Sequence, residues 1–426
     1  MCRIYSSPAL KKRMIIINIS YNEPMNDLPI KSLRMALLVR DERSFSRAAD
    51  RIHLTQSAVS QAIHKLEAQL GHEIFNSSPA GVSVNDNGQK FLDRAERALQ
   101  YLKEIEDSLI RTVGHKLPIV GRVTANQLRA VLEVCKQSSY SRAALTLGLS
   151  QPYVHKAARS FETLCETTLF QRTPQGVESS WLAQQIATRA SLFFSELEQG
   201  RDELREHIGI IDGNLRIGAL PLARASIIPR AVTDIIQRHP SAQISIVDGP
   251  YEEQLNQLLR GELDLIIGAL RTPHPSPNVI QETLFSDQLH LVTGTSHPLA
   301  NQSINDPVVL QKLDWLAPKK GTPARAAFSN YFQQAGLEQP NRIVECSSLV
   351  AIRGLLMESD FAALLPAQQV STDVKMGALA ISPLEISGTQ REIGLTYRKN
   401  WIPTALQRVF LETTRNERSA KQIDQN

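Results

Sequence analysis

Hydrophobic residues near the start of the patterned region follow helical spacing that short turns interrupt. Residues 30–40 place apolar side chains on one face, which predicts a helix. A short second helix is expected over residues 47–52, capped by either Ser44 or Ser46. A third helix follows Thr55, and Leu54 in the preceding turn is expected to fill the core.

A short strand and a turn follow the third helix. Gly71 suits the left-handed end of that helix, and Ile74-Phe75 reads as the start of a strand. Residues 79–81, Pro-Ala-Gly, are typical of a hairpin tip. The pattern predicts three helices followed by a β-hairpin wing, a helix-turn-helix unit.

The same pattern occurs twice. Residues 33–82 and 128–177 align without a gap at an offset of 95, and 18 of the 50 positions are identical. This agreement indicates an internal duplication.

A long amphipathic helix is expected after each wing. Each has an apolar stripe suited to pairing with another helix. The stripe residues are Leu92, Ala95, Leu99, Leu102, Ile105 and Leu109 within residues 89–113, and Leu182, Ile186, Phe193, Leu197, Leu204 and Ile208 within residues 181–208.

The pattern changes after residue 213 to strands alternating with helices. Strands are expected at 213–219, 243–248 and 263–268, with helices at 227–238 and 251–260 between them. Such spacing predicts parallel βαβ units. Further elements are expected at 290–292, 324–335, 342–345, 349–358, 362–365, 392–397 and 403–413, which suits two small α/β lobes with a cleft between them.

The composition excludes some classes of protein but does not identify the function. The net charge of +4 permits a nucleic-acid partner but does not require one. The four cysteines match no zinc spacing, and the apolar run at residues 14–19 is too short for a secretory signal. We expect a soluble cytoplasmic protein with no metal and no cofactor. Sequence motifs of nucleotide-binding and hydrolytic enzymes are absent, so no catalytic residue is expected.

The outer face of the third helix carries side chains suited to base edges in the major groove of double-stranded DNA. A three-helix core without DNA is the simpler alternative, but the repeated pattern favours DNA binding. The expected DNA contacts are Arg47, Thr55, Gln56, Ser57, Ser60, Gln61 and His64 in copy one, and Arg142, Ser150, Gln151, Tyr153, Lys156, Arg159 and Arg172 in copy two.

Residues 46–75, SRAADRIHLTQSAVSQAIHKLEAQLGHEIF, resemble the hallmark of LysR-type transcriptional regulators. Residues 141–170, SRAALTLGLSQPYVHKAARSFETLCETTLF, resemble it less closely. The resemblance implies a winged helix-turn-helix whose linker helix pairs antiparallel with that of a partner chain. Because the linker is duplicated here, one chain could hold both halves of such a DNA-binding head.

The two copies have lost different parts of the family pattern. Copy one keeps Gly71 but has Ser77 where the family usually has Arg, whereas copy two has Glu166 and keeps Arg172. The outer helical face of copy two is more basic. We expect copy one to read bases more strictly and copy two to lean on phosphates or on a different half-site.

The second half also resembles the family's effector domain, on segments such as Leu258 to Gly268 and His297 to Ala300. Ligands in open α/β sheets bind beyond the carboxyl ends of strands, near helix N-termini. With Arg325 and two lysines nearby, an anionic or sugar-like effector is expected; the alternative is that Thr322 and Ser347 merely cap helices. The candidate residues are Leu220, Pro221, Gly249, Tyr251, Arg271, Thr322, Arg325, Ser347 and Ser348.

These observations predict a multidomain chain: two all-α winged helix-turn-helix units with long linker helices, then a two-lobed α/β effector domain. The expected parts are a loose extension (1–28), unit 1 (29–88), linker 1 (89–115), unit 2 (123–180), linker 2 (181–210), the effector domain (213–415) and a tail (416–426). A transcriptional regulator controlled by an effector would account for every part of the chain. We expect it to form a homo-oligomer, a dimer or a tetramer, that could also contact RNA polymerase. The alternative is an architectural DNA-binding protein with a vestigial ligand domain.

Overall fold

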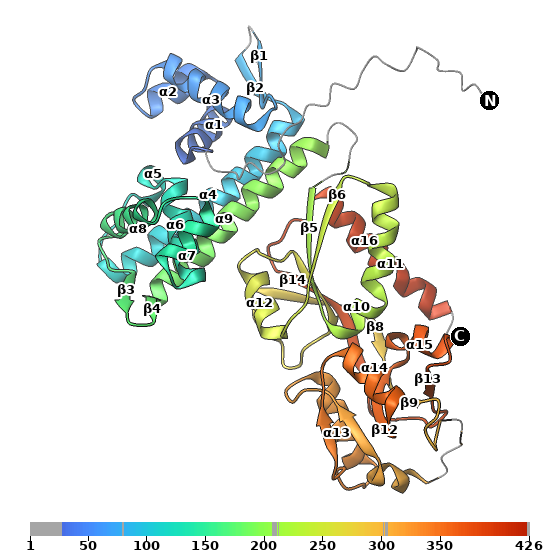
Figure 1. Cartoon of the computed structure of the whole chain (residues 1–426). Coiled ribbons are helices and arrows are strands. Elements are labelled where there is room, and N and C mark those ends of the chain that lie inside the picture. The colour runs from blue at the N-terminus through green and yellow to red at the C-terminus, as the bar shows by residue number, and fades with distance from the viewer. Residues whose placement is uncertain are drawn as a thin grey trace, which may run out of the picture.

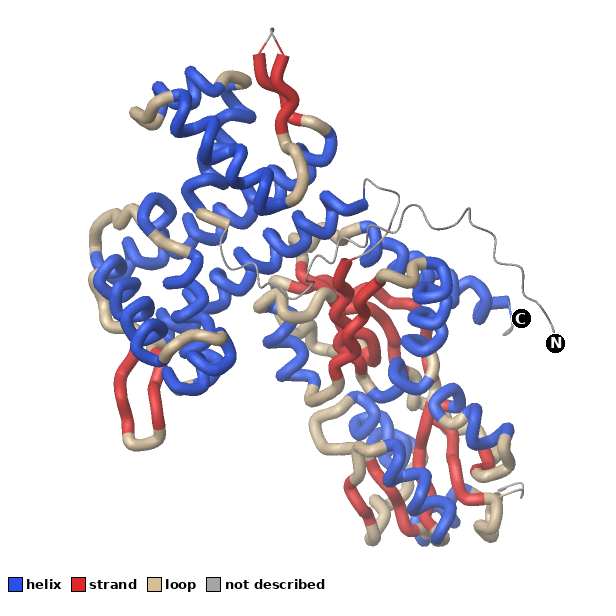
Figure 2. The backbone as a smooth tube through the Cα atoms, turned by 45° about the horizontal axis from the view of Figure 1, so that its top comes forward, coloured by secondary structure: helices blue, strands red, loops and turns tan. Residues whose placement is uncertain are grey.

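The computed structural model describes residues 28–78, 81–206, 211, 213–300, 302 and 306–423. The extension expected before residue 28 lies almost wholly outside these residues. A helical region at the N-terminal side carries two wings, and two α/β lobes follow it (Figures 1 and 2). We call the helical region the head and its two winged units reader 1 and reader 2.

Reader 1 has the predicted order of elements. It consists of α1 (Ile30–Glu42), α2 (Phe45–Arg51), α3 (Gln56–Leu70) and the antiparallel wing strands β1 (Phe75–Ser78) and β2 (Gly81–Val84). Ser44 caps α2 by accepting a hydrogen bond from the Arg47 backbone N–H, so the cap is Ser44 rather than Ser46. The expected wing tip at Pro79 and Ala80 lies outside the described residues.

Reader 2 repeats this architecture. It consists of α6 (Ala125–Gln137), α7 (Tyr140–Leu147), α8 (Gln151–Cys165), β3 (Phe170–Thr173) and β4 (Gly176–Ser179). Where Gly71 ends α3 at φ 71°, Glu166 ends α8 at φ 51°. A non-glycine residue in this left-handed region costs about 1 kcal/mol, and reader 2 has the same helix end as reader 1 despite this cost.

The turn before the third helix of each reader, α3 or α8, which we call the recognition helix, is more exposed than the sequence suggests. Leu54 was expected in the core, but it is 43% exposed, and its counterpart Leu149 is 42% exposed. The core of each reader is instead closed by residues of the recognition helix, such as Val59 and Ile63. Each leucine lies in a surface turn, where the neighbouring helices leave much of its side chain exposed.

The two linker helices pack against each other within the chain. They are α4 (Asp86–Val113), which begins earlier than predicted because Asn85 caps it, and α9 (Trp181–Arg205). The expected stripes are buried over their described residues; Ile208 lies outside them. Lys90, near the start of α4, contacts Glu206 just after the end of α9, whereas Glu104, further along α4, contacts Arg189 nearer the start of α9. The pair is therefore antiparallel (Figure 1).

One continuous hydrophobic cluster joins both readers and both linkers, from Leu28 to Leu204. The short helix α5 (Ile119–Arg122) continues the chain from α4 to reader 2, and Ile119 is part of this cluster. The readers therefore fold around a shared core. Among the described residues, no helix combines the length and the apolar composition that a bilayer span requires.

Lobe I is a mixed five-stranded sheet with strand order β6-β5-β7-β14-β8. Strands β5, β6 and β7 are parallel, as predicted, whereas β14 runs antiparallel to β7 and β8. The elements are β5 (Gly213–Ala219), α10 (Pro221–Ala225), α11 (Ile227–Arg238), β6 (Ala242–Val247), α12 (Tyr251–Leu259), β7 (Leu265–Ala269), β8 (Val279–Asp287), β14 (Arg391–Arg398) and α16 (Ala405–Ile423).

Lobe II is a second mixed sheet, with strand order β11-β10-β12-β9-β13. Strand β10 is parallel to β11 and β12, and β9 is antiparallel to β12 and β13. The elements are β9 (Leu289–Gly294), η3 (Pro307–Lys312), β10 (Asp314–Ala317), α13 (Pro323–Gln334), β11 (Ile343–Glu345), α14 (Leu349–Glu358), β12 (Phe361–Pro366), η4 (Ala367–Gln369), α15 (Ser371–Lys375) and β13 (Leu379–Ile381).

Two sequence expectations for the lobes need correction. Strands β8, β10 and β13 were not predicted, because β10 and β13 are very short and β8 has a mostly polar pattern. Helix α16 continues to Ile423, so the expected tail from residue 416 is largely helical. Its sequence turns polar after Leu411 but contains no glycine or proline that would end a helix.

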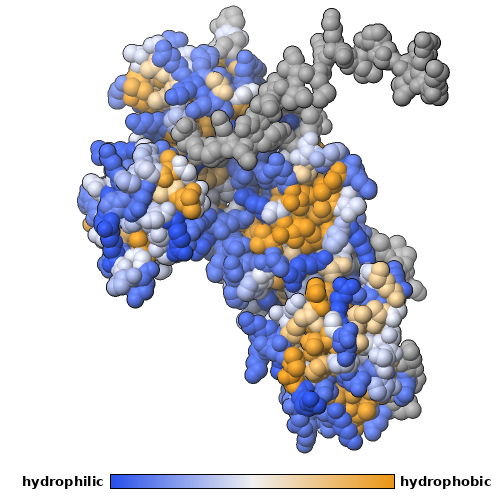
Figure 3. Space-filling model, in the orientation of Figure 1, coloured by the Kyte–Doolittle hydropathy of each residue, from blue (hydrophilic) through white to orange (hydrophobic). Residues whose placement is uncertain are grey.

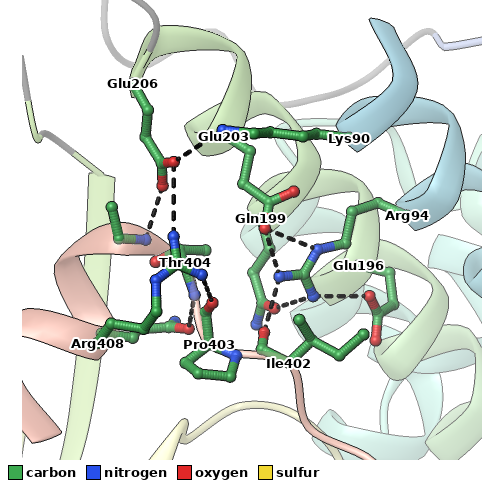
Figure 4. A network of polar contacts seen from close by, with 12 residues as sticks. Lys90, Arg94, Glu196, Gln199, Glu203, Glu206, Ile402, Pro403, Thr404 and Arg408 are labelled. Carbon is green, nitrogen blue, oxygen red and sulfur yellow. Dashed lines mark hydrogen bonds and ion pairs between the residues drawn. The ribbon is translucent and has the colours of Figure 1, made fainter. Parts of the chain in front are cut away.

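A buried arginine seats lobe I on the head (Figure 4). Arg94 of α4, 2% exposed, donates hydrogen bonds to Glu196 (3.0 Å), Gln199 (2.8 Å) and Glu203 (2.7 Å) of α9. It also donates to the backbone oxygen of Ile402, in the segment before α16, over 2.7 Å. Burial alone lowers the pKa of Arg94, but its hydrogen bonds and charge attraction to the two glutamates raise that pKa above its ordinary value.

Replacing Arg94 by alanine is expected to destabilise the head, because it removes the Arg94 cation from the buried carboxylate of Glu203 and leaves Glu196 with Arg97. The expected loss is about 3–5 kcal/mol in the free energy of unfolding. Arg189→Ala is the matched control, since Arg189 is the repeat counterpart of Arg94, is 23% exposed and contacts Glu104. Its loss should stay within about 1 kcal/mol. Urea unfolding followed by helical circular dichroism measures both, and equal losses would contradict the role given to Arg94.

The thiols of Cys135 and Cys165 are expected to be inert. Burial raises the pKa of each to about 12, so each stays protonated at pH 8 and presents no thiolate. Peptide mapping after iodoacetamide treatment at pH 8 should show little labelling at these positions in the native protein and full labelling in urea. The half-buried Cys346 serves as the internal comparison; rapid native labelling at Cys135 would contradict the packing of α6 against α9.

Candidate DNA interface and effector site

The predicted DNA contacts of reader 1 lie around the N-terminal half of α3. Gln56, Ser57, Gln61 and His64 are exposed, and Ser60 is half-buried. Thr55 caps α3 through the backbone N–H of Ala58, so its hydroxyl is partly engaged in the fold. Gln56, Ser57, Ser60 and Gln61 bear no charge, and Nδ1 of His64 lies 3.4 Å from Glu67.

Reader 2 presents a different face on α8. Gln151, Tyr153, Lys156 and Arg159 are all exposed, and Ser150 caps the helix through the backbone N–H of Tyr153. The Tyr153 hydroxyl accepts a hydrogen bond from Asn126, and Arg159 pairs with Glu162 over 2.9 Å. Arg172 is exposed on wing strand β3. This face is therefore basic where that of reader 1 is neutral.

Arg47 and Arg142 occupy equivalent local positions. Each guanidinium donates to a backbone carbonyl at the end of the preceding helix, that of Glu42 or Gln137. Both side chains remain exposed. The arginines thus link the first two helices of their readers.

Two pairs of positioning residues were missed by the sequence reasoning. Ser46 donates to the Gln56 side-chain oxygen over 3.1 Å, and Ser141 repeats this with Gln151 over 3.0 Å. The Ser–Gln spacing of ten residues is identical in the two copies, and this shared spacing is the signal that could have revealed it. The contact restricts the rotamer of the glutamine that leads each recognition helix.

A glutamate ties each wing to the third helix of its reader, and its carboxylate is half-buried in reader 1 and buried in reader 2. Glu67 accepts from the backbone N–H groups of Ile74 (2.8 Å) and Phe75 (3.2 Å). Glu162 accepts in the same way from Leu169 (2.7 Å) and Phe170 (3.0 Å). This role was not predicted from the sequence, and the identity of Glu67 with Glu162 in the repeat is the signal that could have revealed it.

In lobe I, the predicted effector residues gather at the carboxyl ends of β5, β6 and β7. Leu220 and Pro221 begin α10, Gly249 follows β6, and Tyr251 begins α12. The guanidinium of Arg271 lies over the Tyr251 ring, 4.1 Å from its centroid. The side-chain amide of Gln281 of β8 accepts from the Arg271 backbone N–H over 2.8 Å and donates to the Arg271 backbone oxygen over 3.0 Å.

The Arg271–Tyr251 pair is partly withdrawn from water. Burial lowers the pKa of Arg271, and the nearby Tyr251 and Glu252 oppose this shift. Burial also raises the pKa of Tyr251. Among the described residues, no hydrogen bond is found from the Arg271 guanidinium, which leaves its N–H groups free for an acceptor.

In lobe II, the predicted residues lie after β10 and β11. Thr322 caps α13 through the backbone N–H of Arg325, and Ser348 caps α14 through that of Ala351. The residue that caps α14 is therefore Ser348 and not Ser347. Arg325 donates to the Pro318 backbone oxygen (3.1 Å) and lies 3.8 Å from Glu345, so its charge is already engaged.

The two groups of candidate effector residues belong to different lobes, and no described hydrogen bond or ion pair joins them. The lobes meet where α10 packs against η4. Leu220 and Pro221 lie on that side of lobe I. In lobe I the structure brings Arg271 and Tyr251 together, while Thr322 and Ser348 of lobe II act as helix caps.

Comparison with protein families assigns all three parts of the chain. The family model "Bacterial regulatory helix-turn-helix protein, lysR family" matches twice, at residues 30–89 and 125–181. The model "LysR substrate binding domain" matches residues 210–419. The duplication inferred from the repeat is therefore a duplication of the family's DNA-binding unit.

Two relatives differ in how much of the chain they match. The HTH-type transcriptional regulator GalR of Pseudomonas putida is 31% identical over 373 residues, covering 87% of this chain and 93% of the relative. The HTH-type transcriptional regulator PcaQ of Agrobacterium fabrum is 28% identical over 283 residues, covering 66% of this chain and 91% of the relative. The GalR match is long enough to extend over both readers.

Solved structures agree in fold. A full-length OxyR variant from Pseudomonas aeruginosa is 21% identical, with a TM-score of 0.51, and the match covers 69% of this chain and 95% of that one. Full-length CbnR complexed with its target DNA is 19% identical, with a TM-score of 0.51, covering 69% of this chain and 99% of that one. The family consists of regulators rather than enzymes, as expected from the sequence. This chain belongs to the LysR family of bacterial DNA-binding transcriptional regulators and carries the family's effector domain.

Proposed function

We propose that the chain changes its DNA binding when a small anionic effector occupies the site around Arg271 in lobe I. The observation that carries this proposal is a half-buried guanidinium, held over Tyr251, at the carboxyl ends of the parallel strands. Ligands of open α/β sheets bind at this edge, and a partly desolvated arginine binds a carboxylate strongly. A sugar-like effector would bind at the same edge of the sheet, but a neutral sugar would gain less binding energy from the Arg271 cation than a carboxylate would.

The proposal assigns DNA contact to both readers. In reader 1 the amide and hydroxyl groups of Gln56, Ser57, Ser60 and Gln61 suit base edges. In reader 2 the exposed Lys156, Arg159 and Arg172 suit phosphates. The architectural alternative, with a vestigial ligand domain, predicts the same DNA contacts but no response to small molecules.

The test is a screen of the full chain against small mono- and dicarboxylates and neutral sugars. We expect at least one carboxylate to raise the melting temperature and to alter the DNase footprint on bound DNA. Arg271→Gln should weaken that response about tenfold or more, because a charge-assisted hydrogen bond is lost. Arg230→Gln, at an exposed position on α11, is the control and should respond as the wild type does. A footprint that no compound alters would favour the architectural alternative, and an unchanged response in Arg271→Gln would move the site elsewhere.

We also propose that chains associate through lobe I. An apolar patch covers β6 and α11 (Figure 3), where Ile246 is 48% exposed and Ile236 is 45% exposed. Strand β6 is an edge strand of its sheet, so a second copy could cover both its apolar side chains and its free backbone groups.

The double variant Ile236→Glu, Ile246→Lys is expected to shift the protein towards the monomer in sedimentation velocity, because it places charges in the apolar patch. Ile280→Lys, on the opposite edge strand β8, is the matched control and should leave the assembly unchanged. A wild type that sediments as a monomer at all concentrations would contradict association through this patch.

A further inference from the structure

We propose that one chain forms a complete two-reader head that binds a single DNA site made of two unlike half-sites, in one orientation only. The proposal deepens the assigned DNA binding and rests on both readers taking part in it. Four features of the molecule support it: a twofold pattern in the linker pair, a covered linker surface, unlike reading faces and unequal contacts of the effector domain with the two halves of the head.

The contacts between α4 and α9 have the pattern of a twofold interface. In such an interface, if residue i contacts residue j, then the counterpart of i contacts the counterpart of j. Arg94 of α4 contacts Gln199 of α9 at 2.8 Å. Shifting each residue to its repeat counterpart, 95 positions away, gives Arg189 and Glu104, which lie 3.3 Å apart. The two copies within this chain are thus paired as two identical chains pair in a symmetric dimer.

This pairing covers the linker surface that a second chain would need. The apolar stripe of α4 is buried, and the helix that α4 packs against most extensively is α9 of the same chain. The readers and linkers also share one hydrophobic cluster. A second copy therefore finds no free stripe on α4 through which to build another head.

The reading faces at the two ends of this pair differ in chemistry. Reader 1 offers neutral amide and hydroxyl groups, whereas the same helical surface in reader 2 carries Lys156 and Arg159. Position 58 of reader 1 is alanine, but its counterpart is Tyr153, whose hydroxyl is held by Asn126. Two unlike faces held in a near-twofold arrangement fit two unlike half-sites on opposite strands.

Among the described residues, lobe I contacts the two halves of the head unequally. Arg94 is sealed by Ile402, whereas its counterpart Arg189 is 23% exposed. Lys136 of reader 2 pairs with Glu262 of lobe I over 3.0 Å, but the equivalent position in reader 1 is Asp41, which contacts Arg40. Because the effector domain contacts the two halves of the head unequally, the two possible orientations of the chain on DNA are not equivalent.

The test begins with selection of bound sequences from a randomised duplex library by the full-length wild type. We expect an enriched site whose two halves are not inverted repeats of each other. The variant Gln56→Ala, Ser60→Ala should lose sequence preference in one half only, and Lys156→Ala, Arg159→Ala should affect only the other half. Each variant should bind the selected site about 10- to 100-fold more weakly. A perfect palindrome, a variant that alters both halves equally or a variant that changes nothing would overturn the proposal.

Mixing the two variants then tests whether one chain suffices. Each variant chain retains one intact reader, so co-expressed variants restore wild-type affinity for a short duplex only if readers from different chains form a head. We expect affinity no better than that of the stronger variant alone; recovery to wild type would overturn the single-chain head. If the library yields no enriched site, the fault lies with DNA reading itself, whereas an enriched palindrome would refute only this inference. Circular dichroism of each variant, whose changes are confined to the reading faces, verifies that the fold is intact.

Discussion

Two antiparallel helices, one from each copy of the repeat, hold the readers apart and give the effector domain its seat. Their apolar stripes form the centre of the hydrophobic cluster that both readers share. Arg94 is buried towards one end of this pair, where it forms ion pairs with two glutamates of α9 and donates a hydrogen bond to the backbone oxygen of Ile402. A buried charge of this kind is stable only while all its partners stay in place. The position of lobe I therefore depends on the packing of α4 against α9.

The same arrangement offers a physical route between effector and DNA. Glu206, at the end of α9, accepts from the backbone N–H of Ala405 at the start of α16 over 2.6 Å, and Arg408 and Lys90 lie near the same carboxylate (Figure 4). A shift of lobe I would have to move these groups, because close-packed interfaces change between discrete arrangements rather than deforming smoothly. A coupling of about 1–3 kcal/mol is typical of such systems and is enough to alter the geometry of a two-reader head.

Local features were predictable from sequence because short-range chemistry determines them. The helix caps at Thr55 and Ser150, the helix end at Gly71 and the strands from Gly213 and Leu265 follow from residue types at fixed spacing. The repeat located both readers and both linker stripes. The sequence pattern did not predict the strands β10 and β8, because both pair with strands that are far away in the chain.

Contacts across the fold were beyond the reach of the sequence. Arg271 and Tyr251 were both proposed as effector residues, but only the sheet shows that one lies over the ring of the other. Arg325 carried the expectation of an anionic effector, yet in the structure Pro318 and Glu345 already engage it. The intrachain pairing of α4 with α9 was suggested by the offset of the repeat, and the reciprocal contacts of Arg94 and Arg189 supply the geometric evidence.

The covalent link between the readers also changes how such a head can evolve. In a homodimer every substitution in a reading helix appears twice, so both halves of the target must change together. Here a substitution at Gln56 leaves Gln151 untouched, and each reading face can drift alone. The differences between the faces, and the glycine that reader 2 lost at position 166 while keeping its helix end, are the record that such independent divergence would leave.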